Sequence, residues 1–133
     1  MSRPLPQPDA DTAFFWDACA RGELAILRCT ACRRWVHYPR PRCPGCGATT
    51  LEPERVSGRG TVHSFTVTHF PVPGFEPPFA VVLVDLDDAP GVRLVSNLVG
   101  VEPADVRIGT KVEVTFEQHE DVTLPLFKVR TDA

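Results

Sequence analysis

Four of the five cysteines form two pairs with identical spacing. Two residues separate the cysteines within each pair, Cys29/Cys32 and Cys43/Cys46, and ten residues lie between the pairs. This spacing lets one tight turn direct two sulfurs at a single ion, and the linker lets a hairpin bring the second turn opposite the first. Four thiolates can then enclose a metal ion in a tetrahedron with no open position. The pattern therefore predicts structural Zn²⁺ in a ribbon-like segment that has too few apolar residues for a core of its own.

Two other interpretations of the cysteines stay open at this point. Disulfide bonds are disfavoured because the sequence shows no signal peptide and Cys19 would be left over. Iron in a rubredoxin-like site uses similar turns, so a redox protein is an alternative. Several arginines near the pairs can offset the negative charge of a four-thiolate zinc site. These arginines are Arg28, Arg33, Arg34, Arg40 and Arg42.

Length and charge narrow the range of functions. The 133 residues fit one ordinary domain or two small ones. Residues 1–60 carry nine arginines and six acids, whereas residues 61–133 carry five basic residues and eleven acids. An acidic second half counts against a general nucleic-acid binder, whose surface should be basic. No apolar run approaches the roughly 20 residues of a membrane helix, and without a targeting segment we expect a cytoplasmic protein.

A short helix is predicted ahead of the cysteines. Residues 1–10 hold three prolines and little apolar content, so we expect a loose lead-in. Asp11 or Thr12 can cap a helix that runs to about Ala20 and stops at Gly22. The helix carries three adjacent aromatic residues, which cannot all face one small core because helix neighbours are about 100° apart. We expect at least one to be exposed or buried against another surface, and all three are candidate partner contacts. The alternative is that they cap the ribbon and the second unit. These residues are Phe14, Phe15 and Trp16.

Other residues with possible chemistry have simpler interpretations. Cys19 lies within the predicted helix, so we expect a small buried hydrophobe. His37 could replace a cysteine as a ligand, but four thiolates already saturate zinc, so we expect a structural or surface role. The remaining histidines, His63, His69 and His119, are scattered singly. Without a nucleophile elbow or a Ser/His/Asp arrangement, the sequence predicts no catalytic site.

The strand patterns predict a mainly β fold. In the ribbon, residues 24–27, 35–38 and 52–56 should be strands, and the glycine-rich residues 57–60 mark a boundary. Five segments rich in β-branched or aromatic residues follow, separated by clear turn signals. These segments are residues 61–69, 79–87, 92–99, 111–117 and 124–129.

The five later strands match a small Greek-key barrel. Residues 101–106 fit a single helical turn between the third and fourth strands, which is the arrangement of a five-stranded OB-fold barrel. We therefore predict an N-terminal segment and short helix over residues 1–22, a rubredoxin-like zinc ribbon over residues 23–56 and the barrel over residues 57–133.

The connection between the first two barrel strands is a candidate contact surface. Residues 70–78 form a long loop that is rich in proline and cannot pair as a strand. Phe70 and Phe75 would be displayed there as partner contacts. The alternative is that both rings fold back over the barrel mouth.

Several motifs recur in the order of one known family. The chain resembles the zinc-ribbon/OB-fold family of acyl-CoA-associated proteins, from about Phe14 to Val129. One departure is Arg33, where the family usually has a glycine, and we expect slight strain there. The matching motifs are Phe15-Trp16, Gly22-x-Leu24, the four cysteines with Pro39, Pro41 and Pro44, Ser57-Gly58-x-Gly60-Thr61-Val62, Ser64-Phe65-Thr66 and Ile108-Gly109-x-x-Val112.

The resemblance implies an accessory role without chemistry by this chain. Members look like accessory subunits of thiolase-superfamily enzymes and related hydratases, and they are similar to the partner of steroid side-chain aldolases. By this resemblance the chain would bind a thiolase-like subunit and support its action on acyl-CoA in lipid or steroid side-chain metabolism. CoA would lie on the open face between ribbon and barrel, where Arg59 and Arg93 are the candidate phosphate contacts.

Two other functions are alternatives to this accessory role. The first is a single-stranded nucleic-acid-binding module, since OB barrels commonly bind single strands, but the acidic second half counts against it. The second is an iron-binding redox protein, which a red, iron-bearing preparation would support.

Overall fold

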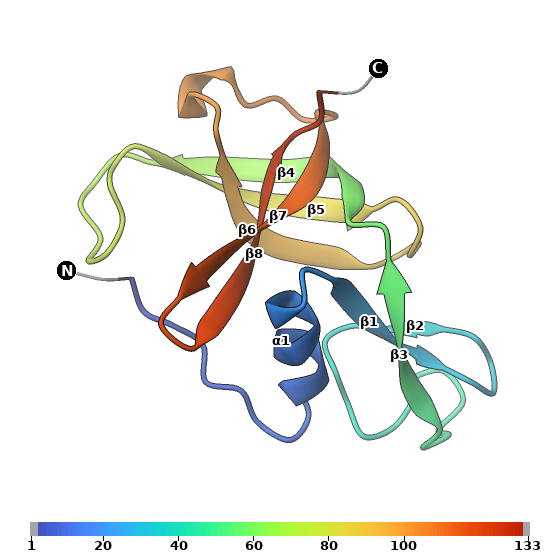
Figure 1. Ribbon diagram of the computed structural model, residues 1–133. Helices are drawn as coiled ribbons and strands as arrows, with labels where there is room; N and C mark the ends of the chain where they lie inside the picture. Colours follow the sequence, from blue (N-terminus) through green and yellow to red (C-terminus); the bar gives the residue numbers. More distant parts are fainter. Residues whose placement is uncertain (1–2, 132–133) are drawn as a thin grey trace.

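The computed structural model describes residues 3–131 and shows a mainly β protein with one short α-helix, α1 (Ala13–Ala20) (Figure 1). An antiparallel three-stranded sheet follows, with the strand order β2-β1-β3. Its strands are β1 (Leu24–Cys29), β2 (Trp35–Val36) and β3 (Leu51–Val56). All three predicted ribbon strands are present, with ends that differ from the prediction by at most two residues.

The C-terminal part is a closed five-stranded barrel with the order β4-β5-β6-β8-β7. A 3-10 helical turn, η1 (Pro103–Asp105), lies between the third and fourth barrel strands. This order and this turn confirm the predicted OB-fold barrel. The barrel strands are β4 (Arg59–Thr68), β5 (Phe79–Leu86), β6 (Arg93–Val99), β7 (Lys111–His119) and β8 (Val122–Val129).

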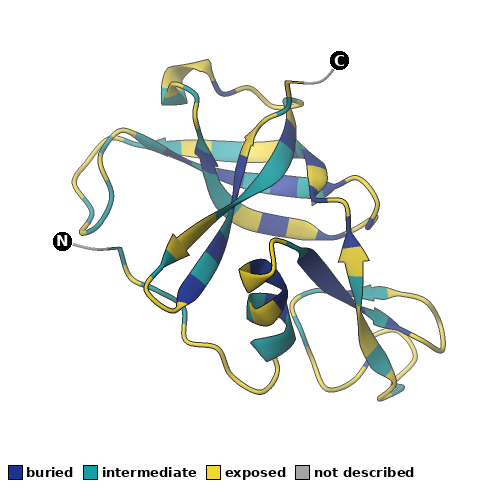
Figure 2. Cartoon of the chain, viewed as in Figure 1, coloured by how far each residue is buried: buried dark blue, intermediate teal, exposed yellow. Residues whose placement is uncertain are grey.

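Alternation along the strands fills the barrel interior. In β5, Ala80, Val82, Val84 and Leu86 are buried, whereas the residues between them are only partly covered. Successive side chains of a strand point to opposite faces, so one set enters the core. The same banding is visible on the barrel strands in Figure 2.

The barrel has a short seam where β6 and β8 run parallel. These strands pair at only two positions, Leu98 with Phe127 and Val99 with Lys128. The preceding part of β6 therefore has no strand partner on that side. α1 packs against β8 and β1, and it lies between the barrel and the ribbon sheet (Figure 1).

Ribbon, helix and barrel share one hydrophobic core. A single cluster of buried side chains contains Leu24 and Ile26 of β1, Phe15 and Cys19 of α1, and barrel residues such as Phe127. The division of the chain after residues 22 and 56 stays a prediction. The side chains of the three predicted segments pack together in this core. The outermost residues of the first and last segments, 1–2 and 132–133, lie outside the described range.

The described part of the lead-in is packed, which corrects the prediction of a loose segment. Arg3 Nη2 donates a hydrogen bond to Asn97 Oδ1 at 3.0 Å, and its guanidinium lies 4.6 Å from the centroid of the Phe75 ring. Leu5 packs against buried side chains of β8. The composition argument missed this because prolines stiffen an extended chain, which then loses less conformational entropy when it docks.

The helix begins and ends at the predicted residues, but the predicted side-chain cap is absent. Thr12 is the N-cap residue, but its side chain does not cap the helix. Instead, the carboxylate of Asp9 accepts hydrogen bonds from the Thr12 N–H at 3.0 Å and from the Thr12 hydroxyl at 3.1 Å. At the other end, Gly22 has a φ of +77°, the left-handed conformation that favours glycine after a helix.

Candidate metal centre and the cavities beside it

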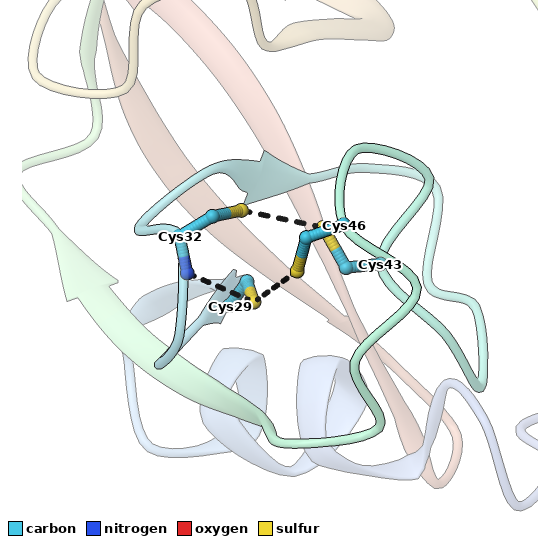
Figure 3. A group of neighbouring side chains, drawn as sticks. All are labelled: Cys29, Cys32, Cys43 and Cys46. Atoms are coloured by element: carbon cyan, nitrogen blue, oxygen red, sulfur yellow. Dashed lines mark hydrogen bonds between the residues drawn. The ribbon is translucent and has the colours of Figure 1, made fainter.

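The four paired cysteines come together at one end of the ribbon sheet (Figure 3). Their Sγ atoms all lie within 4.8 Å of one another, and the Cys29–Cys46 and Cys32–Cys43 pairs are 3.6 Å apart. Sulfurs around a tetrahedral ion at a Zn–S distance of about 2.3 Å would be about 3.8 Å apart. Disulfide sulfurs are only about 2.05 Å apart, so these thiols are not bonded to each other. The geometry fits a tetrahedral metal site.

Backbone N–H groups favour the thiolate form of the buried cysteines. The Cys32 N–H lies 3.4 Å from Cys29 Sγ, and the Gly45 N–H lies 3.3 Å from Cys43 Sγ. The N–H of Cys46, helped by that of Gly45, lowers the pKa of the Cys43 thiol to about 6. The N–H of Cys32 likewise lowers the pKa of Cys29. At Cys32 the Arg34 N–H acts to lower the pKa, but the neighbouring thiols and burial raise it to about 11. The turns therefore favour the thiolate, which is the metal-binding form of cysteine, at Cys29 and Cys43.

The arginines of the ribbon form a paired and an unpaired group. Arg28 Nη1 and Arg33 Nη2 lie 3.0 and 3.3 Å from carboxylate oxygens of Glu54. Within residues 3–131, the side chains of Arg34 and Arg40 form no hydrogen bond or ion pair, and both residues are exposed. The charges of these two guanidinium groups are therefore not offset by an ion pair within the described residues.

Arg33 occupies the position where a glycine was expected. Its φ is +66°, a left-handed conformation that costs a non-glycine residue about 1 to 2 kcal/mol. The Arg33 N–H donates to the Cys29 carbonyl at 3.0 Å, and the side chain is held by Glu54. The predicted strain is present, but the cysteine cluster is intact around it.

Cys19 and His37 lie outside the cluster, as predicted. Cys19 is fully buried in the main core, and this burial raises the pKa of its thiol to about 12. The ring of His37 lies 6.3 Å from Phe15 and 4.3 Å from Tyr38, measured between centroids. Burial lowers the pKa of His37 to about 4, so its ring is neutral at pH 7.

The aromatic residues of α1 pack between the ribbon and the barrel, which is the alternative to exposure that the sequence left open. Phe15 is buried in the main core, whereas Phe14 and Trp16 are half-buried. Phe14 also contacts the cluster beneath the cysteines, and Trp16 also contacts the buried residues at the start of β8. The three rings thus do not share one small core, as expected from their positions on the helix, but contact more than one cluster of buried side chains. A role in partner binding stays a prediction for these residues.

The proline-rich loop between β4 and β5 separates its two phenylalanines. Phe75 stacks on Phe79 with ring centroids 4.8 Å apart, and Arg3 covers it. Phe70 is 67% exposed. Phe75 therefore folds back on the barrel, while Phe70 is the accessible residue of the two predicted contacts.

The two arginines predicted to meet CoA phosphates lie on the barrel strands. Arg93 Nε donates to Asp85 Oδ1 at 2.7 Å, and His63 Nδ1 lies 3.1 Å from the other oxygen of this carboxylate. Arg59 is exposed and interacts within the chain. Neither arginine lines the two cavities between ribbon and barrel. A phosphate contact by either one stays a prediction.

Two adjoining cavities lie where the ribbon meets the barrel. The larger has a volume of about 330 Å³ and mainly apolar walls, supplied by the lead-in, α1, residues 37–39, β6 and β8. The smaller, of about 280 Å³, is polar and is lined by Arg34 and Arg40 among others. His37 and Tyr38 line both cavities, so the two are neighbours.

Sequence reasoning missed two residues at the larger cavity. Tyr38 is 62% exposed and Val95 is 60% exposed, although both are large and apolar. Val95 stands on the outward side of β6, between buried Leu94 and half-buried Ser96. The sequence signal for Val95 was an apolar residue at an outward-facing strand position. Single exposed valines are common on protein surfaces, so this signal alone does not identify a functional site.

Two of the histidines pair with carboxylates rather than with a hydroxyl or thiol group. His63 and His119 each pair with a carboxylate, and no serine or cysteine of residues 3–131 donates to a histidine. A metal held by four cysteines has no open position for a substrate. In the same part of the chain, no helix has the length and apolar character needed to cross a bilayer.

Two family descriptions match adjacent parts of the chain. Residues 16–52 match "ChsH2, rubredoxin-like zinc ribbon domain", and residues 53–117 match "ChsH2, C-terminal OB-fold domain". Together they cover the cysteine cluster and most of the barrel.

Two similar proteins are named as hydratase subunits. The "Probable enoyl-CoA hydratase alpha subunit" of Thermomonospora curvata is 41% identical over 128 residues, which are 95% of this chain and 40% of that protein. The "3-oxo-4,17-pregnadiene-20-carboxyl-CoA hydratase alpha subunit" of Mycobacterium tuberculosis is 41% identical over 120 residues, 90% of this chain and 38% of that protein. The chain thus spans about two fifths of the length of these relatives.

Two further matches cover most of the protein compared. A "DUF35 domain-containing scaffold protein" of Methanocaldococcus jannaschii is 33% identical over 99 residues, 71% of this chain and 68% of that protein. A solved structure described as "Ltp2-ChsH2(DUF35) aldolase" superposes with a TM-score of 0.87 at 38% identity. The superposition covers 94% of this chain and 98% of the matched chain.

Proposed function

The chain belongs to the DUF35 family of zinc-ribbon and OB-fold proteins, and we propose from this membership that it is a non-catalytic accessory subunit of a thiolase-superfamily enzyme. The enzyme would be an aldolase or a thiolase, and the two chains would form a hetero-oligomer. The chain would support the action of this enzyme on acyl-CoA substrates.

The single observation that carries this proposal is the superposition on a chain of the Ltp2-ChsH2 aldolase. It extends over 98% of that chain at 38% identity, so the ribbon, helix and barrel all correspond. A likeness confined to the barrel would be much weaker support for this function, because OB-folds serve many functions. The name of the archaeal relative, a scaffold protein, agrees with a role in assembly.

The non-catalytic part of the proposal rests on the chemistry of the side chains. A general base must lie within hydrogen-bond reach of its nucleophile, and the described histidines have only carboxylate partners or neighbouring rings. The sequestered thiol of Cys19 cannot act as a nucleophile while it is buried and protonated.

We propose Zn²⁺ as the resident metal. Four soft thiolates in a closed tetrahedral arrangement suit a structural zinc ion, which is held by the protein alone and stabilises the fold. Cys29, Cys32, Cys43 and Cys46 would be its ligands. The ion would hold together two turns that have only a small apolar cluster beneath them.

The substrate class is proposed as the CoA thioester of a lipid or a steroid side chain. The names of both hydratase-subunit relatives contain a CoA substrate. The substrate in the name of the mycobacterial relative is a steroid derivative. These names belong to proteins more than twice the length of this chain, so the aldolase likeness is the closer guide.

Co-purification tests the proposal. The tagged chain is expressed with the thiolase-like protein encoded beside it, and the complex is analysed by size-exclusion chromatography with light scattering. Carbon–carbon bond cleavage or thiolysis of acyl-CoA is then assayed for each chain and for the mixture. We expect a stable complex and activity that needs both chains. An enzyme that is fully active alone and never co-elutes with this chain would overturn the accessory role.

A further inference from the structure

We infer that the first half of β6 and the two cavities beside it form a docking groove for an extended segment of the partner enzyme, an inference that rests on the proposed function. The segment would lie along β6 as an added strand. It would carry a large apolar residue for the apolar cavity and an acidic residue for the polar cavity.

The first half of β6 leaves backbone groups unpaired on one side. The Leu86 N–H donates to the Val92 carbonyl at 3.1 Å, so every second residue after Val92 bonds to β5 through its backbone. The N–H and C=O groups of Arg93 and Val95 therefore point away from β5. On that side β8 pairs with β6 only from Leu98 onward, so no described strand reaches Val95. Unpaired edge groups of this kind are a template for an added strand.

This free edge runs along both cavities. Gly91 and Val92 line the polar cavity, whereas Leu94, Val95 and Ser96 line the apolar one. A strand advances about 3.3 Å per residue, so the centres of these two stretches are roughly 12 Å apart along the chain. A segment paired with β6 would therefore reach the two cavities with residues about three or four positions apart.

The apolar cavity can bury an anchoring side chain of the docked segment. Its volume is about 330 Å³, and Phe15, Trp16 and Phe127 are among its mainly apolar walls. Tyr38 and Val95 also line it, and they are 62% and 60% exposed. Interface anchors are commonly large apolar side chains in such pockets. A docked segment would also cover the exposed apolar surface of Tyr38 and Val95, which favours binding.

The polar cavity favours an acidic residue of the segment. Arg34 and Arg40 line it, and their side chains form no hydrogen bond or ion pair among the described residues. No acidic residue of the described chain lines this cavity. Arg34 is held beside the second cysteine turn, since a Cβ added at Gly45 would lie 3.0 Å from Arg34 Cδ. A carboxylate of the partner would therefore meet two cations with no competing acid in the cavity wall.

A polypeptide matches these three features together. Its backbone repeats donors and acceptors at the spacing of β6, and its side chains carry apolar and acidic groups at separate positions. In strand addition, the backbone bonds supply affinity and the side-chain pockets supply specificity. The groove thus fits a protein partner, and the proposed enzyme is the partner to which we assign it.

Binding of matched variants to the thiolase-like enzyme tests this inference. Val95→Pro removes the edge N–H, whereas Val95→Thr keeps it on a β-branched residue of similar size. Proline is tolerated where a strand N–H does not bond to the sheet. Arg34→Gln/Arg40→Gln removes the two cations. Its control is Arg55→Gln, because Arg55 lies outside both cavities in an exposed pair with Glu23.

Calorimetric titration of the metal-loaded chains with the enzyme measures the affinities. Val95→Pro and the double arginine variant should each bind about tenfold more weakly than the wild type, because a backbone bond or charge-assisted bonds are lost. Each control should stay within about twofold of the wild type. Circular dichroism must first show that each variant is folded.

Hydrogen exchange in the wild-type complex tests the groove without any substitution. The Val95 amide should exchange quickly in the free chain and at least about tenfold more slowly in the complex, because the docked strand accepts its hydrogen bond. The Leu94 amide, on the side of β6 that bonds to β5, is the internal reference and should change little. This measurement decides the matter if Val95→Pro does not fold.

The outcomes separate this inference from the proposed function. A folded Val95→Pro variant with wild-type affinity, or a Val95 amide that stays unprotected in the complex, would overturn the groove and leave the accessory role intact. Equal affinities of the double arginine variant and Arg55→Gln would overturn the acidic contact. A chain that never binds the enzyme would overturn the groove and the accessory role together.

Discussion

Phe15 and Trp16 are neighbours on α1 whose rings meet edge to face, with centroids 5.0 Å apart and planes at 82°. Phe15 is buried in the main core, and Trp16 also reaches the separate cluster at the start of β8. Phe14, one residue earlier, contacts the cluster beneath the cysteines. Three consecutive rings thus connect the helix to the barrel and to the ribbon. α1 holds the two parts in a fixed relation, which creates the cavities at their junction.

Truncation of Phe15 should destabilise the whole chain. Phe15→Ala removes a large buried ring from the shared core, so we expect a loss of about 3 to 5 kcal/mol in the free energy of unfolding. Urea denaturation followed by circular dichroism, at a fixed metal content, measures this loss. Phe70→Ala is the matched control because Phe70 is 67% exposed, and it should change stability by less than about 0.5 kcal/mol. Equal effects of the two substitutions would contradict the shared core.

The same Phe70 substitution should affect partner binding. An exposed aromatic residue in a mainly apolar loop is a common anchor of protein interfaces, so Phe70→Ala should weaken the complex with the thiolase-like enzyme by about tenfold or more. Phe75 is stacked on Phe79 and covered by Arg3, so Phe75→Ala should lower stability more than affinity. Surface plasmon resonance on the folded variants measures both affinities. Unchanged binding by Phe70→Ala would remove this loop from the interface.

The metal centre should contain zinc at about one ion per chain. Elemental analysis of the purified chain measures this ratio, and a colourless preparation distinguishes zinc from iron. Cys43→Ser/Cys46→Ser should lose the metal because two thiolate ligands are removed. A red protein with a stoichiometric iron content would instead support the redox alternative.

Thiol reactivity should separate Cys19 from the other four cysteines. With metal bound, neither group should react quickly with an aromatic disulfide reagent, because metal coordination protects one and burial protects the other. After removal of the metal by a chelator, the ribbon thiols should react first, and Cys19 only when urea unfolds the chain. Cys19→Ser is the control that removes the slow phase. Fast labelling of Cys19 in the folded chain would show that the helix opens readily.

The sequence was sufficient where a residue type has one dominant geometric use. Two Cys-x-x-Cys pairs predicted the cluster, and alternating β-branched segments predicted all five barrel strands. The helical turn over Pro103–Asp105 was predicted because proline is suited to the start of such a turn. In each case, local chemistry and the final fold agree.

The features that the sequence did not predict depend on contacts between distant segments. Local sequence patterns do not contain this information. The lead-in looked loose because its composition is poor in apolar residues, yet Arg3 bonds to Asn97, far along the chain. The role of Tyr38 at the cavities requires β2 to lie beside α1 and β6, an arrangement that only the shared core determines. Arg34 and Arg40 could not be distinguished from the other ribbon arginines until Glu54 was seen to pair with Arg28 and Arg33.

The half-buried ring of His37 should make stability depend on pH. Its pKa is about 4 in the folded chain and 6.5 when unperturbed, because burial disfavours the charged form. Between these values the unfolded chain binds a proton that the folded chain does not, so the free energy of unfolding should fall as pH decreases through this window. It should be independent of this group above pH 6.5. In His37→Gln, the fall in the free energy of unfolding across this window should be smaller than in the wild type by about 1 to 2 kcal/mol. This value is reduced because the ring is partly exposed.

Urea unfolding at several pH values between 5 and 7.5, with metal content checked at each, measures the two slopes. The comparison is between variants at the same pH, so metal loss common to both cancels. A wild-type slope that persists in His37→Gln would mean that other groups, such as the cysteine ligands, produce the pH dependence. A slope that disappears would show that the ring at the junction of the two cavities is kept neutral by the packing of Phe15 and Tyr38 around it.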